Sequence, residues 1–285
     1  MKKNISVVRK FLLWWFSKPN SPWVNVNLSI DFTYAQSYLK QLNKNNTTQK
    51  VTVQHLICAS ITRALMAVPE ANSRIVAGRI IPQSHIGIAM PVNLLGHEVG
   101  KKRELSLLLL RDTQKKSLRM LAEEGRDALK KERSGKMTAP FLKNLLKVGE
   151  RLSPAAMHRF LEGFDRLLQR PRFAQYLYDS FPVTTALSNP GAALPSDVEG
   201  ILFRSCNVEL PTRLIHVGTF FAASAVQDEV IPIEGKPAVR PMLPIMLIFD
   251  HRLIDGMKAS KLLLEIMECI KNPEDTFGAN GQALP

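Results

Sequence analysis

Apolar and polar positions recur with two different periods along the chain, which predicts both strands and helices. Strands are expected where residues alternate or run apolar over five to ten positions, at 24–30, 74–81, 86–92, 183–187, 214–223 and 242–249. The helical spacing predicts helices at 34–43, 52–68 and 256–271. Strands and helices that interleave in this order indicate a single α/β domain.

A long helical block interrupts this order after an apolar stretch at 105–110. Three helices are predicted in it, at 113–133, 139–151 and 154–169. Their apolar residues recur at helical spacing: Leu118, Leu121, Leu142, Leu145, Leu146, Phe160, Phe164 and Leu167. We expect this apolar side to pack on the α/β core or to cap a substrate tunnel. The basic residues expected to face solvent are Lys115, Lys116, Lys130, Lys131, Arg133 and Lys136.

Composition places the chain among folded globular proteins. Of its 285 residues, 45% are hydrophobic and 22% are charged, which excludes disorder as the main state. No apolar run reaches 18 residues, so no membrane-spanning helix is predicted. Cys58, Cys206 and Cys269 lie far apart, which suits neither a disulfide framework nor a zinc site. We expect a reducing compartment, the cytoplasm, and no metal.

The net charge of +13 is concentrated in the helical block. Residues 101–180 hold 19 Lys and Arg against 10 Asp and Glu. Such a surface suits an anionic partner, which could be a phosphorylated cofactor, an acidic carrier protein, a membrane or a nucleic acid. A solvated basic surface without a partner is an equally good interpretation. No zinc-finger, homeodomain or aromatic-rich RNA motif supports a nucleic acid.

The first 22 residues form a separate basic segment. Val8, Phe11, Leu12 and Trp15 fall on one face of a predicted helix, and no acidic residue precedes Asp31. We favour a helix packed on its own domain or on a neighbouring subunit. Peripheral membrane contact and a targeting role remain alternatives. The domain itself is expected over 23–273, with the helical insert at about 104–181, followed by a poorly ordered tail over 274–285.

The sharpest candidate for chemistry lies at the junction of the last strand and the last helix. There, an apolar strand leads into Asp250 and His251, and the helix begins after Asp255 and Gly256. A histidine at the end of a buried strand can be held rigidly as a general base. Asp255 is placed where the helix dipole favours a carboxylate. A hydrogen-bonded structural histidine is the alternative interpretation.

A second candidate is Ser188, at the end of the predicted strand 183–187 and before Asn189-Pro190-Gly191. A hydroxyl fixed at a strand end can donate a hydrogen bond to a developing oxyanion. A simple turn, in which Ser and Asn bond their own backbone, explains the same residues.

Taken in order, these segments resemble the acyltransferase core of 2-oxoacid dehydrogenase complexes and the related chloramphenicol acetyltransferases. The similarity covers about 24–100 and 182–273. Four segments carry it: helix 52–68 with the turn 69–75, strand 86–92, the Leu187-Ser188-Asn189 motif, and the strand that ends in Asp250–Gly256. Condensation domains of peptide synthetases share the last motif but have paired histidines, and here Asp250 takes the first place of the pair.

The resemblance implies a mixed-sheet α/β fold of the chloramphenicol acetyltransferase type, here with a long helical insert. It implies that His251 is the general base, that Ser188 bonds the tetrahedral oxyanion, and that Asp255 supports the site through a salt bridge. It also implies a homotrimer whose sites lie between subunits. The acyl donor would be a thioester of coenzyme A or of the phosphopantetheine of an acidic acyl carrier protein.

We therefore expect a thioester-dependent acyltransferase that acts on a thiol, hydroxyl or amine. A stand-alone enzyme is expected, because the chain shows no lipoyl domain and no Ala-Pro linker. The alternative is a non-catalytic trimeric scaffold or binding subunit with the same fold. Retention of His251, Ser188 and Asp255 together argues against a scaffold.

Overall fold

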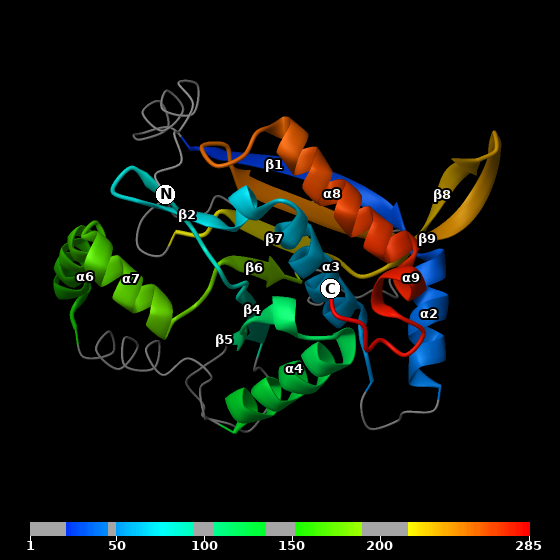
Figure 1. The fold of residues 1–285 in the computed structure, drawn as a ribbon, viewed down its shortest axis with the longest axis horizontal. Helices are drawn as coiled ribbons and strands as arrows, with labels where there is room; N and C mark the ends of the chain where they lie inside the picture. The colour runs from blue at the N-terminus through cyan, green and yellow to red at the C-terminus, as the bar shows by residue number, and fades with distance from the viewer. Residues whose placement is uncertain (1–20, 45–49, 94–104, 135–151, 190–215) are drawn as a thin grey trace.

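A mixed seven-stranded sheet forms the centre of the computed structural model, which describes residues 21–44, 50–93, 105–134, 152–189 and 216–285 (Figure 1). The strand order is β1-β9-β7-β6-β4-β5, and β8 pairs with the first half of β9. Among the strand pairs of the described residues, only β4–β6 and β6–β7 are parallel. The strands are β1 (Trp23–Asp31), β4 (Ile88–Asn93), β5 (Leu105–Leu110), β6 (Thr185–Ser188), β7 (Thr219–Ala223), β8 (Gln227–Ile233) and β9 (Lys236–Asp250).

Four helices cover one face of this sheet and form the main core with it (Figure 1). They are α2 (Thr33–Asn43), α3 (Val53–Ala67), α4 (Leu118–Arg133) and α8 (Gly256–Lys271). The side chains of Leu187 in β6, Phe221 in β7 and Leu247 in β9 point into this core. The opposite face carries a smaller cluster that includes Ala222, Met246 and Ile248. The predicted α/β class is therefore confirmed, and most of the predicted strands and helices are present.

Two hairpins differ from the sequence prediction. The segment 74–81, predicted as one strand, is a hairpin of β2 (Ser73–Val76) and β3 (Arg79–Pro82). Both residues of its turn, Ala77 and Gly78, have positive φ, the geometry that suits a two-residue hairpin loop. The turn Glu234-Gly235 has the same geometry and joins β9 to β8, a strand that the sequence analysis missed.

The structure confirms part of the prediction for the helical insert. In α4, Leu118 and Leu121 are buried in the core, whereas Lys130, Lys131 and Arg133 are exposed at its end. Lys115 is also exposed, but Lys116 is half-buried and pairs with Glu124. Leu142, Leu145, Leu146 and Lys136 lie outside the described residues.

The insert also contains a helix that was not predicted. Helix α6 (Pro154–Leu168) is followed by α7 (Pro171–Ser180), which lies between the last predicted helix, 154–169, and the expected end of the insert at about 181. Pro171 occupies the first turn of α7, a position that does not need its missing N–H. Tyr178 of α7 packs on Val76 of the β2–β3 hairpin, so this end of the insert is attached to the domain beside the sheet (Figure 1).

The expectation of a poorly ordered tail is wrong. Residues 273–277 form helix α9, and its Phe277 is completely buried. The Tyr38 hydroxyl donates a hydrogen bond of 2.8 Å to the Gly278 carbonyl, and the Arg119 amide donates to the Gly281 carbonyl. The tail is therefore held by contacts with α2 and α4, which a local sequence pattern does not reveal.

The N-terminal prediction stays untested, because residues 1–20 lie outside the described part of the chain. Within the described ranges, every helix is too short or too polar to cross a membrane.

Candidate functional site

The two predicted catalytic residues lie at opposite ends of the sheet. Ser188 is the last residue of β6, and His251 directly follows β9. Strand β6 runs parallel to β7, whereas β9 runs antiparallel to β7. The carboxyl ends of β6 and β9 therefore point in opposite directions along the strands, toward opposite ends of the strands of the sheet.

The strand register gives the size of this separation. Ser188 aligns with Ala222 of β7, and Ala222 aligns with Met246 of β9. His251 comes five residues after Met246, a displacement of about 17 Å at the usual rise of a strand. The described chain thus does not bring the two side chains together in one subunit.

Ser188 lies on the face of the sheet that the main helices do not cover. Its neighbour Leu187 points into the core, and successive side chains of a strand point to opposite faces. Ser188 is half-buried, and it shares its face with Ala222 and Met246. Its hydroxyl is therefore held on a strand end outside the helix-covered core.

A cavity of about 210 Å³ lies beside the Ser188 strand end, on the helix side. It is mainly apolar, with three polar side chains, Gln54, Asn189 and Ser224. The side-chain Nδ2 of Asn189 donates a hydrogen bond of 3.2 Å to Gln54 Oε1, which connects the end of β6 to the start of α3. The remaining lining residues are Val53, Ile57, Leu187, Ala223, Ala225 and Val226.

A larger groove of about 1110 Å³ adjoins this cavity and shares Val53 and Val226 with it. Lys40, Lys44 and Lys50 line the groove, and no acidic residue is among its described lining residues. Apolar residues such as Phe32 and Leu39 form the rest of its wall together with polar ones. A groove of this kind can hold a ligand that joins an anionic group to a less polar chain.

The backbone of the His251 turn is fixed on both sides. The His251 amide donates to the Pro22 carbonyl at 2.9 Å, just before β1. The Asp250 amide donates to the Gly218 carbonyl at 3.0 Å, and the Asp250 carbonyl accepts from Leu253. His251 itself is half-buried, with its ring 6.0 Å from that of Phe249. The predicted base is therefore carried by a hydrogen-bonded turn.

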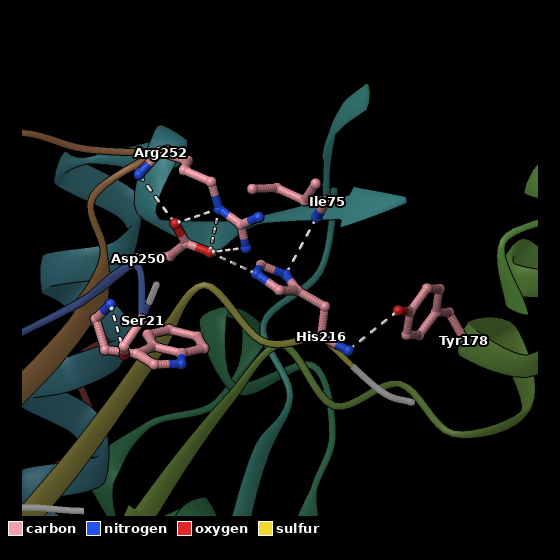
Figure 2. Close-up of polar contacts among 7 residues, drawn as sticks. Ser21, Ile75, Tyr178, His216, Asp250 and Arg252 are labelled. Carbon is pink, nitrogen blue, oxygen red and sulfur yellow. Dashed lines mark hydrogen bonds and ion pairs between the residues drawn. The ribbon is translucent and has the colours of Figure 1, made fainter. Parts of the chain in front are cut away.

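Asp250 is fully buried and forms the centre of a polar cluster (Figure 2). Its carboxylate accepts hydrogen bonds from Arg252 and from Nε2 of His216. Burial alone would raise the pKa of Asp250, but the hydrogen bonds from His216 and Arg252 and the charge of Arg252 outweigh this effect, and the pKa of Asp250 is lowered. The sequence analysis missed His216, because no motif connects it with Asp250.

Asp255 caps helix α8, as its predicted place near the helix start suggested. Its Oδ1 accepts a hydrogen bond of 3.0 Å from the Lys258 amide, and the side chain is exposed. This contact satisfies one of the open amides at the helix start. The salt bridge that the resemblance implied for Asp255 stays a prediction.

The described ranges contain no group of three or more His, Cys, Asp or Glu side chains arranged to hold a metal ion. Cys58 and Cys269 are buried as free thiols, and burial raises the pKa of Cys58 to about 12 and that of Cys269 to about 11. Neither thiol is thus poised as a nucleophile at neutral pH.

Comparison with known proteins gives one family match and several relatives. Residues 14–144 and 219–278 match the family described as 2-oxoacid dehydrogenases acyltransferase (catalytic domain). His251 and Asp255 lie inside the matched residues, and Ser188 lies outside them. A succinyltransferase component of the 2-oxoglutarate dehydrogenase complex from Rickettsia typhi is 22% identical over 249 residues, or 87% of this chain and 48% of that protein. The chain thus spans about half the length of this relative.

Solved structures share the fold at low sequence identity. A probable dihydrolipoamide acetyltransferase from Listeria monocytogenes has a TM-score of 0.60 and 19% identity, and the similarity covers 100% of this chain and 98% of that one. A chloramphenicol acetyltransferase has a TM-score of 0.54 and 16% identity, with 95% and 100% covered.

Proposed function

The chain belongs to the family of 2-oxoacid dehydrogenase acyltransferase catalytic domains, and on this basis we propose that it is a thioester-dependent acyltransferase. The resemblance inferred from the sequence and the predicted fold class are thereby confirmed. The donor is a thioester of coenzyme A or of a carrier-bound phosphopantetheine, and the acceptor is a thiol, hydroxyl or amine. The observation that carries the proposal is the family's His-x-x-x-Asp-Gly motif at the β9–α8 junction, on His251.

The proposed reaction needs a base and an oxyanion donor but no covalent enzyme intermediate. The His251 imidazole takes the proton of the acceptor as the acceptor attacks the thioester carbonyl. The tetrahedral oxyanion accepts a hydrogen bond from the Ser188 hydroxyl. When the intermediate collapses, the carbon–sulfur bond breaks, and the departing thiolate takes the proton back from His251. Acyl group and proton have then changed places, and the enzyme is unchanged.

Because β6 and β9 run in opposite directions and Ser188 and His251 lie at their carboxyl ends, we propose that His251 of one chain acts with Ser188 of another. A homotrimer, as the sequence resemblance implied, would repeat this pairing three times around a closed ring. The β8–β9 hairpin extends from the body of the domain (Figure 1). Its cross-strand partners Val230 and Val239 are 69% and 65% exposed.

The direct test is an acyl-transfer assay with purified protein, short acyl thioesters of coenzyme A and small thiol acceptors. Release of free coenzyme A that depends on the acceptor supports the proposal. If no combination of coenzyme A or carrier-bound donors with thiol, hydroxyl or amine acceptors gives turnover, the scaffold interpretation replaces it.

Replacing Ser188 by Ala is expected to lower kcat by about 100-fold and to leave KM nearly unchanged, because the bond to the oxyanion forms only in the transition state. Steady-state kinetics of Ser188→Ala and Ser188→Thr measure this effect. The threonine variant keeps a hydroxyl and should retain more activity than the alanine variant. A change confined to KM would assign Ser188 to substrate binding.

The groove lined by Lys40, Lys44 and Lys50 is expected to bind the phosphates of the donor. The triple variant Lys40→Glu, Lys44→Glu and Lys50→Glu should raise KM for an acyl-coenzyme A about tenfold or more at low salt, with a smaller effect at high salt. Lys261→Glu, an exposed lysine of α8, is the matched control. An unchanged KM would place the donor elsewhere. A smaller effect on a phosphate-free pantetheine thioester would identify the phosphates as the group recognised.

A further inference from the structure

The buried cluster around Asp250 bears directly on the candidate base, because Asp250 immediately precedes His251. We propose that His216, acting through the Asp250 carboxylate, is a positioning residue that holds the His251 turn in its working orientation. This inference rests on the proposed acyltransferase function. It concerns a histidine that lies 35 residues before His251 and belongs to no motif that the sequence analysis recognised.

The Asp250 carboxylate closes the turn on itself. Its Oδ1 accepts hydrogen bonds of 2.9 Å from both the amide and Nε of Arg252, and its Oδ2 accepts from Arg252 Nη2 at 2.7 Å. The two residues that flank His251 are therefore joined by a two-point ion pair. Arg252 is only 8% exposed, which limits the screening of this pair by solvent.

His216 attaches this closed turn to the rest of the domain (Figure 2). Its Nε2 lies 2.8 Å from Asp250 Oδ2, and its Nδ1 accepts a hydrogen bond of 3.1 Å from the Ile75 amide of β2. Since Nδ1 is an acceptor, a neutral ring must carry its proton on Nε2 and donate it to Asp250. The contact with Ile75 thus fixes the tautomer that Asp250 requires.

Contacts with β1 and α7 hold the His216 ring and backbone, and the chain that follows His216 lies close to β2. The Trp23 ring of β1 stacks on the His216 ring, with 5.9 Å between centroids and 19° between planes. The His216 amide lies 3.4 Å from the Tyr178 hydroxyl of α7, to which it donates a hydrogen bond. Two residues after His216, Gly218 lets the chain approach β2, because a Cβ there would lie 2.7 Å from the carbonyl oxygens of Ala71 and Ser73. The helical insert therefore reaches the His251 turn through α7.

Loss of the His216 donor would leave Asp250 Oδ2 with Arg252 as its partner in a fully buried environment. A buried carboxylate that loses a hydrogen bond tends to move toward other donors or water, and such a movement shifts the adjoining residue. Displacement of a catalytic group by about 1 Å can lower the rate about 100-fold. The expected consequence is therefore a loss of kcat rather than a loss of substrate binding.

Two conservative variants separate positioning from general stability. In His216→Gln, the amide nitrogen can replace Nε2 and keep the bond to Asp250, whereas in His216→Asn the shorter amide can replace only Nδ1. We expect His216→Asn to lower kcat about 10- to 100-fold with KM nearly unchanged, and His216→Gln to stay within a few-fold of the natural protein. His158→Asn, an exposed histidine on α6, is the control for the substitution itself.

The outcomes separate this inference from the proposed function. Equal losses of kcat in His216→Gln and His216→Asn, or no loss in either, would overturn the role of the bond to Asp250. If His216→Asn does not fold, Arg252→Lys keeps the charge but loses the two-point contact, and the same fall in kcat at constant KM is required of it. Full activity of His251→Ala would overturn the proposed function itself, whatever the His216 variants do.

Discussion

Turnover is expected to fall by about 100-fold or more when His251 is replaced by Ala, because a positioned general base contributes a factor of this order. The loss should appear in kcat and kcat/KM, while the oligomeric state stays unchanged. The measurement is steady-state acyl transfer together with light scattering of the same preparation. His158→Ala, the exposed histidine on α6, is the control and should keep full activity.

Near-normal turnover of the His251→Ala protein would contradict the general-base role. The site would then use another base, or the activity would lie elsewhere on the fold. A protein that never shows turnover, with or without His251, would instead support the non-catalytic scaffold that the sequence left open.

The second large effect is a recovery of activity in mixed trimers. The Ser188→Ala and His251→Ala chains are each expected to be nearly inactive alone. If each site takes His251 from one chain and Ser188 from its neighbour, a trimer that contains both kinds of chain has one site with both natural residues. Mixed trimers should then regain about one third of the natural turnover.

The mixed trimers can be made by co-expression of the two chains with different affinity tags and purification on both tags in turn. Each variant purified alone is the control for residual activity. Mixed trimers that stay at the level of the single variants would show that both residues act within one chain or that one of them does not act. Either result would contradict the arrangement inferred from the opposite ends of β6 and β9.

The candidate base was predictable because its signal is local. A buried strand, a turn and a capped helix follow one another within about twenty residues of β9 and α8, and the structure confirms this order. Asp255 caps α8 through the Lys258 amide, as the position of a carboxylate before a helix suggests. Such a signal depends on neighbouring residues only, so the sequence contains all of it.

The hairpins were missed although they carry a short-range signal. In Ala77-Gly78 and Glu234-Gly235, a glycine follows a residue that itself adopts positive φ, which Ala and Glu do only at a cost. The alternation on both sides of Gly78 reads equally well as one strand or as two. Helix α7 was missed for a similar reason, because Pro171 can end one helix or begin the next.

The sequence by itself determined the fold class, the main helices and strands, the family resemblance and the place of His251 on the chain. These follow from local period, capping and motif spacing. Only the tertiary structure decided that Ser188 and His251 lie at opposite ends of the strands of one sheet, and that His216 forms a hydrogen bond with Asp250. Both results depend on strand order and register, which are set by pairing between segments distant in the chain, as β7 pairs with β9 and His216 Nδ1 with Ile75. No pattern within a single segment contains that information, because the contacts form only when the sheet assembles.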